Sequence, residues 1–181
     1  MLLKFPVFMP SGRTHDRITL LCLPAFTALC WWGFKDARYA LLAGSAFLFS
    51  GLMFGPDLDI HSQQYKRWGP LRWLWLPYQK LLRHRSLWSH GFLVGTLGRI
   101  LYLGFWLMLG LGGGQLIYSW LTKTPLLNVG FQQLRPLSEE LRADAISIWL
   151  GLETGAMSHS LSDWVVSFYK KRRKKSNRSV R

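Results

Sequence analysis

Long apolar runs and short polar segments alternate along this chain of 181 residues. Apolar runs of helix length occupy residues 18–34, 39–55, 98–121 and 145–168. A helix that crosses a hydrocarbon core about 30 Å thick needs roughly 17 to 25 residues. No run alternates with period two, and Leu, Ala and Gly outweigh Val, Ile and Thr, which disfavours strands. The pattern predicts an all-α fold: an integral membrane bundle of about four transmembrane helices.

A soluble all-α protein with buried helices is the alternative to this bundle. Few soluble helices lack polar residues on every face, which favours the membrane. The chain is 49% apolar and 15% aromatic, which excludes an intrinsically disordered protein. Two cysteines are too few for a disulfide scaffold. We expect a single membrane-embedded helical domain over residues 1–169 and a tail over residues 170–181.

The positions of the charged residues predict the topology. With four spans, both termini and the loop between the second and third spans lie on one side of the membrane. Most of the Lys and Arg residues, which give the chain a net charge of +14, fall on that side. The positive-inside rule therefore places both termini in the cytoplasm. Arg99 is expected near the cytoplasmic end of the third span, where its long side chain can reach the interface.

Two basic segments outside the spans have expected partners. Residues 68–83 mix Trp and Tyr with Lys and Arg, as does an interfacial segment with its rings at headgroup level and its cations toward anionic lipid. An amphipathic surface packed on the bundle is the alternative. Residues 170–181 hold eight cations and no anion, which predicts a disordered polybasic tail. Anionic lipid of the bilayer is the expected partner of this tail, ahead of nucleic acid, and a plain topology anchor without a specific partner is an alternative of at least equal weight.

Histidines and aspartates lie next to the expected cytoplasmic end of every span. In this topology the following residues converge at one end of the bundle: His15, Asp57, Asp59, His61, His84, His90, His159 and Asp163. His159 and Asp163 are four residues apart and therefore share one helix face. Ionisable groups within a span are costly and tend to mark function. A hydrogen bond between histidine and aspartate that ties helices together is the structural alternative.

These residue types indicate a divalent metal site. Asp57 and Asp59 are two residues apart and are expected in an extended loop, where they can bridge two cations. His and Asp without Cys suit Zn²⁺ or Mn²⁺, and more than one ion fits such a set. Bound ions of this kind can lower the pKa of water to roughly 7 and supply hydroxide for hydrolysis.

Four short motifs carry a resemblance to a known family. They are residues 10–16 (Pro-Ser-Gly-Arg-Thr-His-Asp), 55–59 (Gly-Pro-Asp-Leu-Asp), 84–90 (His-Arg-Ser-Leu-Trp-Ser-His) and 158–163 (Ser-His-Ser-Leu-Ser-Asp). In this order they resemble the metal-binding membrane proteins of unknown function that are common in cyanobacteria. They are more distantly similar to the predicted membrane-bound metal-dependent hydrolases. The resemblance covers residues 10–165 and fits a plasma (inner) or thylakoid membrane.

The resemblance implies a metal centre formed by seven residues: His15, Asp57, Asp59, His84, His90, His159 and Asp163. The hydrolases have His where Ile60 stands here, so His61 is either a substitute or a bystander. Their His pair is five residues apart, whereas His84 and His90 are six apart. A likeness in ligand order to zinc-dependent phospholipase C and P1-type nucleases suggests phosphoester cleavage by analogy.

The function expected from these features is that of a membrane-bound metal-dependent hydrolase acting on a phosphoester or lipid-like substrate at the cytoplasmic face. Asp59 and Arg85 are the expected catalytic residues, with Arg85 or a second cation holding the developing charge. A non-enzymatic metal-binding or membrane assembly protein is the alternative, because a closed structural site lacks the open position that hydrolysis needs. Glu153 is expected to hydrogen-bond another helix rather than to carry protons.

Overall fold

Every regular element that the structure describes is helical. The computed structural model describes residues 12–124 and 139–179, and within these ranges it contains no strand, which confirms the all-α prediction. The elements are α1 (Gly12–Phe34), α2 (Ala37–Leu52), η1 (Pro56–Asp59), α3 (Gln63–Arg67), η2 (Gly69–Leu74), α4 (Trp75–Leu81), α5 (Leu87–His90), α6 (Val94–Thr122) and α7 (Glu139–Ser179), of which η1 and η2 are 3₁₀ helices.

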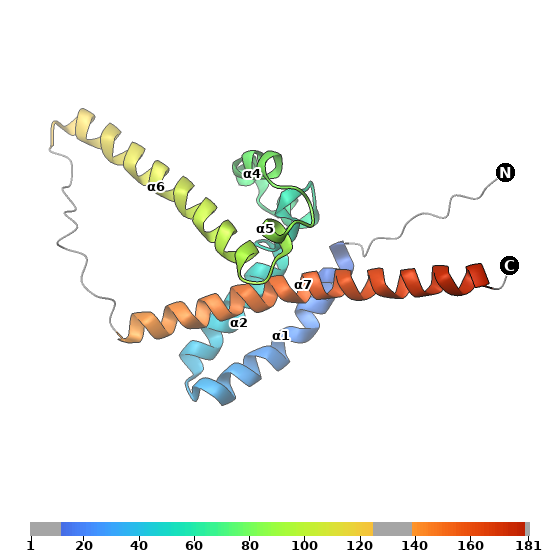
Figure 1. Ribbon diagram of the computed structural model, residues 1–181. Helices are drawn as coiled ribbons and strands as arrows, with labels where there is room; N and C mark the ends of the chain where they lie inside the picture. Colours follow the sequence, from blue (N-terminus) through green and yellow to red (C-terminus); the bar gives the residue numbers. More distant parts are fainter. Residues whose placement is uncertain (1–11, 125–138, 180–181) are drawn as a thin grey trace.

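Helix α2 is the centre of the molecule. It packs along α7 over its length and along α1 on another side, and these three helices form the bundle. The short elements from η1 to α5 make a compact lobe beyond the end of α2 (Figure 1). Helix α6 leaves that lobe and projects away from the bundle, so most of its surface is free of contacts with the described residues.

Two glycines of α7 allow its backbone to approach α2. A Cβ atom at Gly155 would lie 2.5 Å from the carbonyl oxygen of Phe47, and one at Gly151 would overlap the carbonyl oxygen of Ala43. Gly151 and Gly155 are four residues apart and therefore stand on one ridge of α7. Continuing that ridge by two further steps of four residues reaches His159 and Asp163, at the level where α2 ends.

An aromatic core fills the lobe. Phe54, Leu58, Tyr65, Trp75 and Tyr78 are all buried and in mutual contact. The expectation that the rings of residues 68–83 lie at headgroup level is therefore wrong for Trp75 and Tyr78. Burial of two large rings inside the protein removes more apolar area from water than an interface does. The packed-surface alternative holds for this pair, while Trp73 remains half exposed.

Three helices, rather than the predicted four, are long and apolar enough to cross a membrane. Among the described residues they are Gly12–Phe34, Ala37–Asp59 and Val94–Thr122. Helix α7 is not one of them, because Ser, Thr, His and acidic residues dilute its apolar run. The predicted boundaries also shift, since α1 begins at Gly12 instead of residue 18 and α6 at Val94 instead of residue 98.

Helix α7 continues into the basic tail. Its backbone is helical through Ser179, so the predicted disorder of the tail is wrong for residues 170–179. Lys and Arg are good helix formers. Figure 1 shows this end of α7 extending beyond the bundle.

The close contact between α2 and α7 gives a stability prediction. Replacing Gly155 with alanine forces the two backbones apart, and we expect the free energy of unfolding in detergent to fall by about 1–3 kcal/mol. Gly113→Ala in α6 is the matched control, because a Cβ atom there meets nothing within 4 Å and alanine favours a helix. Equal melting temperatures for the two variants would contradict this role of Gly155.

Candidate metal centre

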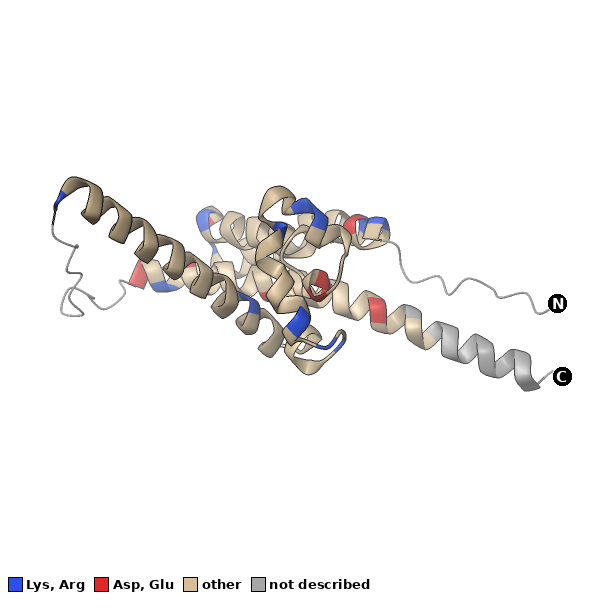
Figure 2. Cartoon of the chain, turned by 90° about the horizontal axis from the view of Figure 1, so that it is seen from above, with Lys and Arg blue, Asp and Glu red and all other residues tan. Residues whose placement is uncertain are grey.

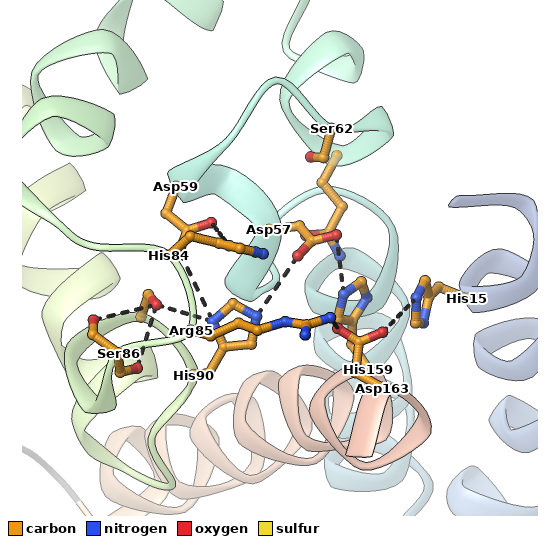
Figure 3. A network of polar contacts seen from close by, with 12 residues as sticks. His15, Asp57, Asp59, Ser62, His84, Arg85, Ser86, His90, His159 and Asp163 are labelled. Atoms are coloured by element: carbon orange, nitrogen blue, oxygen red, sulfur yellow. Dashed lines mark hydrogen bonds and ion pairs between the residues drawn. The ribbon is translucent and has the colours of Figure 1, made fainter. Parts of the chain in front are cut away.

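All seven predicted metal-binding residues meet at one place in the fold. The first turn of α1 supplies His15, η1 supplies Asp57 and Asp59, the α4–α5 connection supplies His84, the last residue of α5 is His90, and α7 supplies His159 and Asp163. Figure 3 shows these side chains directed toward one another from five segments of the chain. The predicted extended loop at Asp57 and Asp59 is instead a 3₁₀ turn that begins with Pro56.

One group of ligand-type side chains lies between α1 and α7. The group consists of His15, His159 and Asp163. Each residue offers one ligand atom, and these three atoms lie within 4.8 Å of one another. The Nε2 atom of His15 is 3.3 Å from Oδ1 of Asp163. The two imidazole rings are stacked with centroids 3.8 Å apart. Both histidines are buried, and Asp163 is partly exposed.

A second group lies between η1 and the α5 region. Asp57, His84 and His90 again place one ligand atom each within 4.8 Å of the others. Asp57 also connects the two groups. Its Oδ2 atom is 3.1 Å from Nε2 of His159, and its Oδ1 atom is 3.7 Å from Nε2 of His90. A carboxylate in that position has one oxygen for each group.

Asp59 lies behind the second group. Its Oδ1 atom is 2.9 Å from Nδ1 of His84, and its side chain is fully buried. An ionised carboxylate accepts hydrogen bonds only, so His84 carries its proton on Nδ1 and has a lone pair on Nε2. Carboxylates commonly orient metal-binding histidines in this way. Asp59 belongs to neither group of three, and its predicted roles as ligand and catalyst stay predictions.

Two serines that the sequence analysis missed set the tautomers of two further histidines. Ser162 Oγ donates to the carbonyl oxygen of His159 and lies 2.8 Å from Nδ1 of His15. Because a hydroxyl has one proton, Ser162 accepts from the Nδ1–H group of His15. Ser89 lies 2.9 Å from Nδ1 of His90 in the same manner, with backbone carbonyls for its own proton. Both histidines therefore direct Nε2 into the centre, and this atom carries a lone pair when the ring is neutral.

Several buried atoms of the centre have no hydrogen-bond partner among the residues that the structure describes. They are Oδ2 of Asp59, Nε2 of His90 and both ring nitrogens of His159. A buried polar atom without a partner costs about 1–3 kcal/mol, so four in one place need an explanation. Coordination of cations supplies it, since imidazole nitrogen and carboxylate oxygen are the donors that Zn²⁺ and Mn²⁺ accept. The residues present thus fit divalent metal ions.

The charges around Asp163 lower its pKa. Burial raises the pKa of this carboxyl group, but when the neighbouring imidazoles are protonated, the hydrogen bond from His15 and the charges of His159 and His15 lower it by more. Asp163 therefore remains ionised and available as a ligand. The guanidinium of Arg85 lies 3.6 Å from its Oδ2 atom and is partly exposed. Arg85 itself is held with φ at +61°, which aims this cation at the centre.

A buried arginine holds the element that carries His90. Arg99 is 1% exposed, so the prediction that it reaches the interface is wrong. It donates from Nη1 to the carbonyl oxygen of Ser89 at 2.8 Å and from Nη2 to Thr96 Oγ1 at 3.0 Å.

Glu153 accepts a hydrogen bond from the backbone N–H of Leu93 at 2.9 Å, which confirms that it bonds across helices. Leu93, with φ at +62°, marks the sharp turn between α5 and α6.

Two neighbouring residues lie outside the centre. His61 is exposed and packs its ring on Tyr65 with centroids 4.9 Å apart, so it is in neither group of three. Asp16 is in neither group of three and forms an ion pair with Arg67 at 2.5 Å. The hydrogen bonds from Arg67 to Asp16 raise the pKa of this guanidinium and tie α1 to α3.

The fold and the site together define a helical metal-binding protein. The chain belongs to the family described as "Uncharacterized metal-binding protein (DUF2227)", whose model matches residues 10–173. It is also 30% identical over 135 residues to an uncharacterized protein of Aquifex aeolicus (strain VF5), covering 74% of this chain and 95% of that protein. No solved structure matches the chain. The predicted resemblance to a metal-binding family is thereby confirmed.

The serine contacts predict an effect on metal affinity. Ser89→Ala and Ser162→Ala remove the groups that fix the histidine tautomers, and we expect each to weaken Zn²⁺ binding by about 10–100-fold. Competition with a chromophoric chelator measures the change. Ser158→Ala is the control, because its hydroxyl bonds only to the carbonyl oxygen of Gly155 in its own helix among the described residues. Equal affinities for all three variants would refute the orienting role.

Proposed function

We propose that this protein is a membrane-bound metal-dependent hydrolase that acts on a phosphoester or lipid-like substrate at the cytoplasmic face. The observation that carries the proposal is the connection of two groups of metal-type ligands through Asp57, beside an open cleft. The cleft has a volume of about 220 Å³ and is lined by Arg85, His90, Asp163, Trp164 and Ser167. It therefore touches a residue of each group.

Membrane insertion is supported by the exposed surface of α6. The helix has 29 residues, and most of the large apolar side chains along it are exposed. Figure 2 shows α6 without coloured charged positions over most of its length. A soluble monomer rarely exposes so large an apolar surface, whereas a bilayer covers it. We propose that α1, α2 and α6 span the plasma (inner) or thylakoid membrane, with the first half of α7 beside α2.

The same arrangement supports a cytoplasmic metal centre. At the side of the bundle remote from the centre, the end of α1 is joined to the start of α2 by a short connection. The end of α6 lies remote from the centre as well and leads to the segment before α7. The centre and the basic lobe lie at the opposite ends, together with the starts of α1 and α6. By the positive-inside rule, that basic end faces the cytoplasm along with both termini.

The two groups would hold one cation each. His15, His159 and Asp163 would bind one, and His84 and His90 the other, with Asp57 between them. Zn²⁺ or Mn²⁺ suits these nitrogen and oxygen donors. Such cations acidify water and withdraw charge from a phosphoryl oxygen, which is the chemistry that phosphoester hydrolysis requires.

The residues around the cleft suit an anionic substrate with an apolar part. Arg85 can donate two parallel hydrogen bonds to phosphate oxygens and stabilise the charge that develops on them. Trp164 is 63% exposed and offers an apolar wall. These features support the relationship to membrane-bound metal-dependent hydrolases that the sequence motifs suggest.

A non-enzymatic role is the second candidate, and the burial of the first group favours it. His15 is 5% and His159 is 3% exposed. A structural site of this kind is closed and needs no substrate access. The two candidates differ in whether metal-loaded protein turns over a phosphoester.

Metal content tests the centre. We expect detergent-purified protein to contain stoichiometric Zn or Mn by elemental analysis, and His90→Ala/His159→Ala to lose it, because one ligand is removed from each group. His61→Ala should keep its metal, since this histidine lies outside both groups. Protein that is folded yet binds neither metal after reconstitution would overturn the proposal.

Arg85 separates catalysis from metal binding. We expect Arg85→Ala to retain the metal and to hydrolyse bis-p-nitrophenyl phosphate about 10²–10³-fold more slowly, the usual cost of removing one group that stabilises the developing charge. Arg83→Ala, an exposed cation two residues away, is the control and should keep its rate. Metal-loaded wild type without turnover of phosphodiesters or phospholipids would favour the non-enzymatic role.

A further inference from the structure

A second and larger cleft lies on the lobe, away from the metal-centre cleft. Its volume is about 520 Å³, and it is lined by His61, Tyr65, Lys66, Pro70, Arg72, Trp73 and Leu76. It shares no lining residue with the cleft at Arg85. His61 comes from the connection between η1 and α3, and the other residues come from the three short helices α3, η2 and α4, which together form one basic and aromatic hollow.

The charge of this cleft is suited to an anion. Lys66 and Arg72 are exposed and form no ion pair with any residue in the described part of the chain. No acidic residue lines the hollow. Two unneutralised cations over a concave surface attract and retain phosphate groups, and Arg can hold two phosphate oxygens at once.

The cleft also has an apolar side, which suits a ligand with an apolar part. Trp73 is 51% and Leu76 is 41% exposed. The ring of Trp73 meets that of Trp106 on α6 in an edge-on contact with centroids 5.5 Å apart, and Tyr102 of α6 donates a hydrogen bond to the carbonyl oxygen of Leu74. The rim of the cleft therefore adjoins the first half of α6, the candidate span with the smallest buried share. Aromatic rings beside cations, at the end of an apolar helix, are typical of a membrane interface.

We propose that this cleft binds the headgroup of an anionic phospholipid. Lys66 and Arg72 hold the phosphate, while Trp73 and Leu76 contact the glycerol and the first acyl carbons that continue along α6. The site rests on the membrane location in the proposed function but not on hydrolysis. It fixes the depth of the lobe relative to the bilayer and holds the metal centre at the membrane surface.

Lipid titration of the full chain in a mild zwitterionic detergent tests the site. Short-chain phosphatidylglycerol is titrated against intrinsic tryptophan fluorescence, with phosphatidylcholine and inorganic phosphate in parallel arms. The variant is Lys66→Gln/Arg72→Gln. The matched control is Arg17→Gln/Lys80→Gln, which removes the same charge from exposed positions outside the cleft.

We expect phosphatidylglycerol to bind in preference to phosphatidylcholine, and the cleft variant to bind it roughly 30-fold more weakly. That loss follows from about 1 kcal/mol for each cation near an anionic lipid. The control pair should bind as wild type. Equal losses in both pairs, no preference for the anionic lipid, or equally tight binding of inorganic phosphate would each overturn the lipid site.

Metal content measured on the same samples separates this site from the metal centre. The cleft variant should retain all its metal, since no cleft residue is a ligand. Wild type that binds metal but not phosphatidylglycerol refutes the lipid site alone. Protein that binds phosphatidylglycerol without metal refutes the hydrolase proposal alone.

Discussion

The close approach of the α2 and α7 backbones is the constraint on which the centre depends. Gly151 and Gly155 occupy the contact, and any larger residue there would collide with carbonyl oxygens of α2. The same ridge of α7 then presents His159 and Asp163, just where α2 gives way to the turn at Asp57. Small residues at a helix interface permit this separation in lipid as well as in water. The distance between the two groups of ligands is therefore set by backbone contact, not by the ligands themselves.

The buried polar groups of the centre favour the binding of cations, but without cations they lower the stability of the folded protein. The carboxylates are close to imidazoles, and serine hydroxyls hold the Nδ1 atoms of His15 and His90, so the side chains are oriented before a ligand arrives. Orientation in advance lowers the entropy lost on binding. The atoms left without hydrogen bonds still penalise the folded state. Binding of cations would remove that penalty, so metal affinity and stability are coupled.

The sequence predicted the members of the centre better than its geometry. Apolar runs fixed where the helices lie, and each His or Asp motif adjoins the same end of a run, so convergence followed from topology. Asp57 and Asp59 were expected to bridge two cations from an extended loop, yet in the 3₁₀ turn Asp57 lies beside His159 and Asp59 beside His84, while His90 lies near both. Ser89 and Ser162 carry no signal of their own, because serine is common beside any helix. Helix α7 was predicted as a span from its apolar residues, whereas the residues that dilute its hydropathy are those that serve the centre.

The burial of the Arg99 side chain helps to fix the position of α6. A guanidinium group this deeply buried needs hydrogen-bond acceptors inside the protein, and Arg99 finds them in the backbone of α5 and in the side chain of Thr96. Glu153 of α7 accepts a hydrogen bond from the adjoining turn at Leu93. The start of α6 is thereby tied both to the segment that carries His90 and to the helix that carries His159. A displacement of α6 would strain these hydrogen bonds, so the position of an apolar helix and the spacing of the metal ligands are mechanically linked.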